Sequence, residues 1–295
     1  MPQGPRRPNT WVGYVLVAAA ATSWGSQSVV AKILLASGLA PSTLVSARTA
    51  SAFLLLILGL AGLAPRLLRV TRRTLGRIAV LGIFGMALSQ YTYYFALTQI
   101  PVVTALLVIF TSPLFVLAAS ALAYREPVRR GDLVAAVVTL AGAALVIRVY
   151  DPAGLRVNAL GIAASLFCAV SFAFYSLWAK TVPVSPWTML TYSLGTAAAF
   201  WIPLAPPWGF LLAPHPPRMW AGFAVIVVFG TLVPFGLFLA GLRRISAAHA
   251  SVMSTLEPVV AAGVALVVLG ESLAWPQLAG GALVLAGIGL LHTRA

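Results

Sequence analysis

Polar and aromatic side chains recur at helical spacing inside otherwise apolar stretches of the sequence. The first such stripe consists of Ala20, Ser23, Trp24, Gln27 and Ala31. Two related stripes are Ala87, Gln90, Tyr94 and Leu97, and Ala164, Cys168, Ser171, Tyr175 and Trp178. Residues at this spacing share one helix face, so each stripe can offer aromatic and hydrogen-bonding groups to a ligand. Such stripes also pack helices together or anchor them at a bilayer interface, and the sequence leaves both roles open.

Glu257 is the one carboxylate that lies well inside an apolar stretch. Burying a carboxylate in such surroundings costs free energy. Glu257 could pair with a ligand ammonium, or it could bind and release a proton that acts as the coupling ion. Alternatively, serine or backbone groups beside Pro258 satisfy it as a structural carboxylate. The residues that we predict to bind a small molecule are Trp24, Gln27, Gln90, Tyr94, Ser171, Tyr175, Trp178 and Glu257.

The elements that hold these residues must lie in a membrane. Of 295 residues, 61% are hydrophobic and 8% are charged, and the mean hydropathy is +0.99. Apolar runs of about 20 residues recur from end to end, each long enough to cross a hydrocarbon core of roughly 30 Å as a helix. This composition excludes a water-soluble fold. The formal charge of +14 would suggest a nucleic-acid partner in a soluble protein, but basic cytoplasmic loops explain it better.

Glycine, proline and charged residues divide the apolar runs into ten predicted transmembrane helices, an all-α integral membrane fold. Their predicted starts are Val12, Ser42, Leu75, Val102, Gly131, Ala159, Trp187, Met219, Ala247 and Pro276. Both termini are predicted to be cytoplasmic, because most of the 19 Lys and Arg residues then fall in cytoplasmic connections. Those residues are Arg6, Arg7, Arg66, Arg69, Arg72, Arg73, Arg77, Arg125, Arg129, Arg130, Lys180, Arg243, Arg244 and Arg294.

The strongest pattern is an internal repeat. At an offset of 145 residues the chain aligns with itself, matching Gly85 with Gly230, Ala105 with Ala250, Pro113 with Pro258, and Glu126 with Glu271. This predicts two five-helix repeats, residues 12–149 and 159–292. Because five is odd, the second repeat enters the bilayer upside down, which predicts a 5+5 inverted-topology repeat. That architecture is typical of secondary transporters that alternate access to a site near the membrane midplane.

Two sequence motifs resemble those of the drug/metabolite transporter superfamily, and specifically of its EamA family. They are WGS at 24–26, followed by Lys32, Pro41 and Arg48, and TLEPVVAAGVALVVLGESL at 255–273, echoed by FTSPLFVLAASALAYREPV at 110–128. The resemblance covers essentially the whole chain and is greatest to YddG-type exporters of aromatic and other amino acids. It implies ten helices, cytoplasmic termini, a bacterial inner membrane and export. It also implies a central cavity lined mainly by the first, third, fourth, sixth, eighth and ninth spans.

Four further residues are candidates for gating. Pro113 and Pro258 fall inside matching helices and Pro234 interrupts another, and each removes a backbone hydrogen bond. Kinks at symmetric depth could be hinges between states, or they could only shape the cavity. His249, near the predicted cytoplasmic start of its helix, is predicted to be a gate or loop residue. For Arg48 we favour snorkelling, or bonding to backbone carbonyls near the outer mouth, over pairing with a substrate carboxylate.

The absence of certain sequence motifs excludes some classes of function. The sequence lacks the phosphate loop of ATPases and the nucleophile and zinc motifs of membrane enzymes, so we expect no enzyme. A single cysteine, five acids and three histidines predict neither an intramolecular disulfide nor a metal site or other cofactor. We expect a secondary transporter that exports amino acids or similar small metabolites, with the lipid bilayer and the solute as its partners. The alternatives are an exporter of cationic drugs that uses Glu257, and a receptor or structural bundle that transports nothing.

Overall fold

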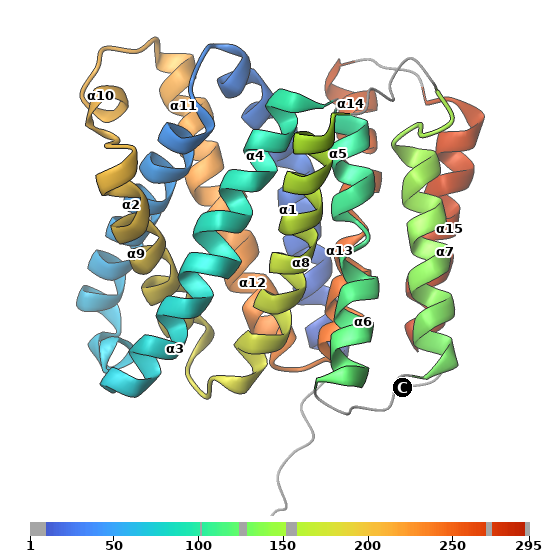
Figure 1. Cartoon of the computed structure of the whole chain (residues 1–295), viewed down its shortest axis with the longest axis horizontal. Coiled ribbons are helices and arrows are strands. Elements are labelled where there is room, and N and C mark those ends of the chain that lie inside the picture. The colour runs from blue at the N-terminus through green and yellow to red at the C-terminus, as the bar shows by residue number, and fades with distance from the viewer. Residues whose placement is uncertain (1–9, 101, 124–128, 152–157, 270–272, 293–295) are drawn as a thin grey trace, which may run out of the picture.

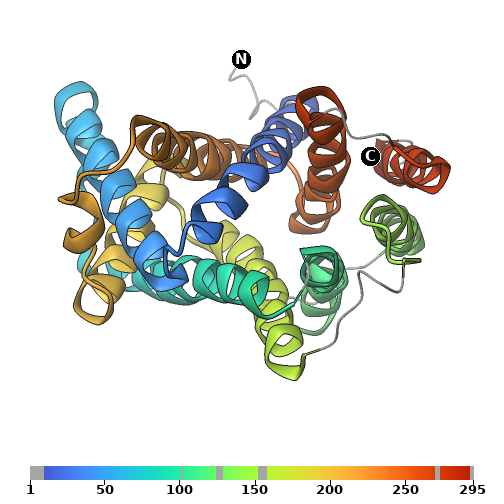
Figure 2. The ribbon, with the colours of Figure 1, turned by 90° about the horizontal axis from the view of Figure 1, so that it is seen from above.

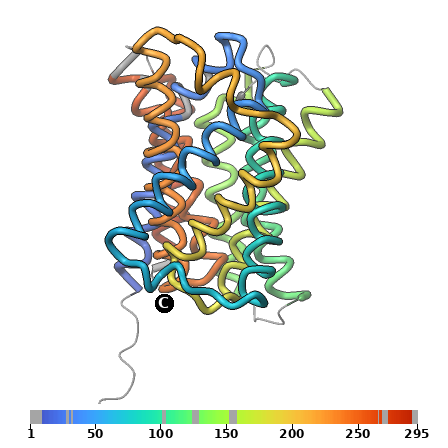
Figure 3. The backbone as a smooth tube through the Cα atoms, turned by 90° about the vertical axis from the view of Figure 1, so that its left-hand side faces the viewer, coloured from blue at the N-terminus to red at the C-terminus, as the bar shows by residue number. Residues whose placement is uncertain are grey.

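The computed structural model describes residues 10–100, 102–123, 129–151, 158–269 and 273–292, and every regular element in these ranges is helical. The long helices, and pairs of shorter helices that continue one another, run from one end of the molecule to the other (Figures 1 and 3). A helix begins within three residues of each predicted span start. The repeated acids Glu126 and Glu271 lie outside the described residues.

The described residues of the first half of the chain form seven α-helices. They are α1 (Thr10–Ala36), α2 (Pro41–Leu63), α3 (Arg72–Gly82), α4 (Ser89–Gln99), α5 (Val102–Ile109), α6 (Ser112–Leu122) and α7 (Arg130–Val146). A short 3₁₀ helix, Pro65–Leu68, follows α2, and a π-helical segment, Ile83–Leu88, joins α3 to α4.

The second half forms the remaining helices. They are α8 (Ala159–Thr181), α9 (Pro186–Leu204), α10 (Trp208–Leu211), α11 (Pro217–Val227), α12 (Val233–Leu242), α13 (Ala247–Ser254), α14 (Glu257–Leu269) and α15 (Trp275–His292). A second π-helical segment, Val228–Leu232, joins α11 to α12.

Helix boundaries in the two halves recur at the offset seen in the sequence. Adding 145 to the bounds of α3 gives those of α11, and adding it to α5 gives α13. The two π-helical segments also begin 145 residues apart. Corresponding helices run in opposite directions, since α3 and α4 rise from the lower edge of Figure 1 whereas α11 and α12 descend towards it. The α1 helix begins and α15 ends at that lower edge, which we call the terminal end.

Prolines mark the points at which long helices break. The α5–α6 helix is interrupted at Phe110–Thr111 and the α13–α14 helix at Thr255–Leu256. Pro113 and Pro258 each occupy the second residue of the helix that follows. Proline fits the first turn of a helix because it has no N–H to bond backwards. Pro234 has the same place in α12, directly after the π-helical segment.

Five helices in the described ranges are long and apolar enough to cross a membrane. They are Pro41–Leu63, Arg72–Gln99, Thr104–Leu122, Ala159–Thr181 and Pro217–Leu242, and Trp275–Leu290 is a shorter apolar helix. The α7 and α15 helices form a pair at one side of the bundle (Figure 2). Gly142 and Gly280 allow this pairing, because a Cβ on either would lie 2.6 Å from the carbonyl oxygen of the other.

Candidate functional site

A cavity lies at the middle of the bundle, where α1, α4, α8 and α12 meet the two broken helices. About 740 Å³ of space lies between its lining residues, part of it open to solvent. Its apolar and aromatic wall consists of Trp24, Tyr93, Tyr94, Leu106, Ile109, Phe110, Phe172 and Phe235. Its other lining residues are Gln27, Arg48, Ser89, Gln90, Ser112, Cys168, Gly230, Ser251, Ser254 and Glu257.

Five of the predicted binding residues line this cavity, namely Trp24, Gln27, Gln90, Tyr94 and Glu257. Ser171, Tyr175 and Trp178 do not. The α8 face that lines the cavity carries Cys168 and Phe172, which are one turn apart, and the helix then continues beyond the cavity towards the terminal end.

The three α8 residues outside the lining have other neighbours. Ser171 is buried. Tyr175 is buried beside Gly85, where a Cβ would lie 2.7 Å from its ring. Trp178 donates from its indole nitrogen to the carbonyl oxygen of Arg77 at 3.1 Å. The structure therefore gives Tyr175 and Trp178 packing contacts on the terminal side of the cavity.

Arg48 is buried in the cavity wall, with 2% of its surface exposed, and it does not snorkel. Its Nη1 donates to Gln90 Oε1 at 3.0 Å and to the Tyr94 hydroxyl. Its Nη2 donates to the Gly230 carbonyl at 3.0 Å and to Thr231 Oγ1 at 2.8 Å, and its Nε donates to Thr231 Oγ1 at 3.1 Å. One side chain on α2 thus fixes two cavity residues of α4 and the π-helical segment of the other half.

Glu257 is held in the wall by a close contact between α1 and α14. It is the first residue of α14, where a carboxylate is favoured by the helix dipole. A Cβ at Gly25 would lie 2.5 Å from the Glu257 carbonyl oxygen, so only glycine lets the two backbones approach this closely. Ser112, which occupies the corresponding place at the start of α6, lines the same cavity.

Aromatic rings pack together on the terminal side of the cavity. This aromatic floor consists of Trp24, Phe172, Tyr175, Phe235 and Phe238. The Trp24 ring lies 5.1 Å from that of Phe235 and 5.8 Å from that of Phe238, between centroids. Further from the terminal end, α1 and α8 contribute Gln27 and Cys168 to the cavity, and the π-helical segment before α12 contributes Gly230. The aromatic floor therefore lies between these residues and the terminal end.

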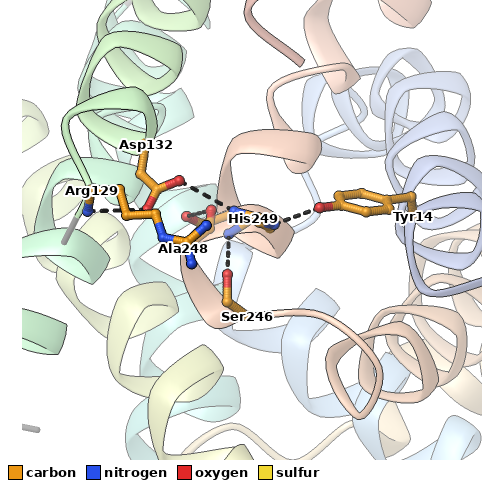
Figure 4. A network of polar contacts seen from close by, with 7 residues as sticks. Tyr14, Arg129, Asp132, Ser246, Ala248 and His249 are labelled. Atoms are coloured by element: carbon orange, nitrogen blue, oxygen red, sulfur yellow. Dashed lines mark hydrogen bonds and ion pairs between the residues drawn. The ribbon is translucent and has the colours of Figure 1, made fainter. Parts of the chain in front are cut away.

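A polar tie joins three helices near the terminal end (Figure 4). The His249 ring of α13 lies between the hydroxyl of Tyr14 on α1, 2.5 Å from Nδ1, and Asp132 Oδ1 on α7, 3.3 Å from Nε2. Ser246 caps α13 by accepting from the His249 backbone N–H at 3.0 Å. We call Tyr14, His249 and Asp132 the terminal tie. It connects the first helix of one half to the broken helix of the other.

Sequence reasoning did not single out several lining residues. Phe110 and Ser254 adjoin the two helix breaks, so the prolines three and four residues later could have pointed to them. Phe172 and Phe235 had no such signal, because isolated phenylalanines in apolar helices are common.

Comparison with known proteins identifies the family. The sequence profile of the EamA-like transporter family matches the chain twice, over residues 11–148 and 159–293. The chain belongs to this family. A solved crystal structure of a protein is similar to this EamA-like transporter over 98% of the chain and 97% of its own length, with a TM-score of 0.76 and 20% identity. At that identity the likeness concerns the fold alone.

Three curated relatives of this EamA-like transporter are also transporters by name. YicL of Salmonella typhimurium, an uncharacterized inner membrane transporter, is 27% identical over 96% of both chains. An uncharacterized transporter of Archaeoglobus fulgidus is 29% identical over 80% of this chain and 83% of its own. A probable terminal-alkyne amino-acid exporter of Streptantibioticus cattleyicolor is 27% identical over 77% of this chain and 76% of its own. The protein is accordingly a membrane transporter and not an enzyme.

Proposed function

We propose that the protein exports neutral amino acids, aromatic ones included, or similar small metabolites across the inner membrane by alternating access. The observation that carries this proposal is the central cavity. It combines aromatic walls with a few polar groups, and it lies where helices of opposite direction meet. The exporter from Streptantibioticus, which is named for an amino acid, supports the choice of solute.

The proposed architecture is ten membrane spans in two inverted five-helix repeats, 12–149 and 159–292. Support comes from the recurrence of helix bounds at one offset and from the two matches to one family profile. The proposed orientation places the terminal end in the cytoplasm. Five arginines between α2 and the first turns of α3 lie at that end, as the positive-inside rule requires: Arg66, Arg69, Arg72, Arg73 and Arg77.

In the proposed cycle, Trp24, Gln27, Gln90, Tyr94 and Glu257 contact the solute in the cavity. Tyr175 is part of the floor beneath it, which Ser171 and Trp178 support from the same helix. The helix breaks at Pro113 and Pro258 and the π-helical junction at Pro234 act as hinges. His249 holds the terminal end closed while the cavity faces the opposite side. A proton is the proposed coupling ion, with Glu257 as its carrier.

Counterflow in proteoliposomes tests this function. Proteoliposomes that contain the purified protein are preloaded with unlabelled phenylalanine, leucine or serine. Uptake of the radiolabelled solute is then followed with and without a pH gradient. We expect uptake above that of protein-free liposomes for at least one amino acid. Absence of flux across a broad panel of solutes would support a receptor or a structural bundle instead.

A second candidate function is the export of cationic drugs, which the carboxylate of Glu257 among aromatic rings favours. Flux of a lipophilic cation such as tetraphenylphosphonium, measured beside that of phenylalanine, separates the two candidates. Cation flux without amino-acid flux would replace the present proposal.

The native cysteine provides a direct probe of the cavity. Cys168 lines the cavity and its sulfur lies 3.6 Å from the Ser89 hydroxyl. Alkylation with N-ethylmaleimide adds a bulky group there, so we expect counterflow to fall by about tenfold or more, and added solute to slow the reaction. In the Cys168→Ser protein the reagent should not change counterflow. Full inhibition of that variant by the reagent would place the reactive site elsewhere.

A further inference from the structure

The hydrogen-bond donors of the cavity's one guanidinium are fully used. Arginine carries five N–H donors in a fixed fork. At Arg48 five bonds occupy them, two from Nη1, two from Nη2 and one from Nε. All the acceptors are neutral, and among the described residues no carboxylate forms an ion pair with Arg48. The guanidinium of Arg48 therefore contributes positive charge to the cavity wall but has no free N–H that could donate a hydrogen bond to a solute carboxylate.

Two acceptors in the cavity wall, at Gln27 and Glu257, lack a hydrogen-bond donor among the described residues. Gln27 is 6% exposed, and its Oε1 is buried without a hydrogen-bond partner in the described part of the chain. The Glu257 carboxylate lines the same cavity, and no described residue donates a hydrogen bond to it. Ser251 and Ser254 donate their hydroxyl protons to carbonyls of their own helix, at 3.1 and 3.0 Å, so their oxygens can only accept.

We infer that the cavity selects solutes that carry a protonated amine, which Glu257 and Gln27 bind. This inference rests on the proposed function and narrows its substrate class. An ammonium group brings three donors and a positive charge, which complement these oxygens and the charge of Glu257, whereas a solute carboxylate finds no free N–H on Arg48. A solute carboxylate is tolerated in the field of Arg48 but is not required.

The asymmetry of the repeat gives the bound solute one orientation. At the start of α6 the residue equivalent to Glu257 is Ser112, and both line the cavity. Symmetric acids would offer two equivalent ammonium sites, whereas a single acid offers one. The apolar body of the solute then lies against Trp24, Phe172 and Phe235.

The test is a panel of four ligands of one shape, applied to the purified full-length protein at neutral pH. The ligands are phenylalanine, phenethylamine, N-acetylphenylalanine and 3-phenylpropanoate, and binding is measured by titration calorimetry and by competition in counterflow. We expect phenylalanine and phenethylamine, which have a free amine, to bind at least about tenfold more tightly than N-acetylphenylalanine and 3-phenylpropanoate, which have none. Loss of a charge-assisted hydrogen bond predicts a difference of this size. Equal binding of phenylalanine and N-acetylphenylalanine would overturn the inference.

Glu257→Gln should remove the preference for amines. The substitution should weaken the binding of phenethylamine about tenfold and leave the binding of 3-phenylpropanoate unchanged. His215→Ala, at a residue outside the cavity lining, should keep the preference. An unaltered preference in Glu257→Gln would also refute the assignment. If that variant does not fold, the wild-type panel still decides. Amine-selective binding without any flux would refute the proposed transport alone, whereas flux without amine preference would refute this inference alone.

Discussion

Replacing Arg48 with lysine is expected to lower the free energy of unfolding by about 2–4 kcal/mol. Lysine offers three donors from one point, so at least two of the five bonds are lost and buried acceptors are left without donors. The affected groups join α2 to α4 and to the π-helical segment Val228–Leu232, so the loss weakens contact between the two halves. Chemical unfolding of the protein in detergent, followed by tryptophan fluorescence, measures this change.

The matched control is Arg218→Lys, at an exposed arginine near the start of α11. Its unfolding free energy should stay within about 0.5 kcal/mol of the parent. Equal stability of the two lysine variants would mean that the guanidinium network of Arg48 contributes nothing, contrary to the geometry described above.

Replacing His249 with alanine is expected to make Cys168 at least about tenfold more reactive from the terminal side of the membrane. The substitution removes both contacts of the terminal tie, to Tyr14 and to Asp132, and leaves the aromatic floor as the remaining barrier. States open to the terminal end then become more populated. The measurement is the rate of alkylation by a membrane-impermeant maleimide in vesicles that expose that end.

His215→Ala serves as the control for this experiment. His215 lies between α10 and α11 at the opposite end, where its Nε2 contacts the Phe210 carbonyl at 3.0 Å. Its loss should leave the rate from the terminal side unchanged. Identical rates for the His249→Ala protein and the parent would show that the tie does not hold this end closed.

The helices could be predicted closely because membrane spans are long and apolar and because the repeat constrains their ends. Pro41 and Pro186 each begin a helix, one residue before the predicted starts at Ser42 and Trp187. The π-helical segments Ile83–Leu88 and Val228–Leu232 could not be predicted, because a single π-helical turn is rare and both lie inside continuous apolar runs.

The site could be predicted in part. Trp24, Gln27 and Gln90 belong to stripes that face inward at the depth of the cavity, whereas the stripe on α8 continues past the cavity to Tyr175 and Trp178. Periodicity defines a face but not the depth at which that face meets open space. The environment of Arg48 was predicted only in part. The bond to a backbone carbonyl, that of Gly230, was among the alternatives, but the side-chain partners on α4 and at Thr231 were not, since they are 42 to 183 residues away in the chain.

The most direct test of the proposed architecture is to determine on which side of the membrane two equivalent helix starts lie. These are Ala40, before α2, and Ser185, before α9. Each is changed to cysteine in a Cys168→Ser background and labelled in intact cells with an impermeant maleimide. Two halves of opposite orientation predict that Ala40→Cys is labelled from outside the cell and that Ser185→Cys is labelled only after the membrane is opened. Labelling of both positions from the same side would contradict the inverted repeat, and with it the proposed alternation around the central cavity.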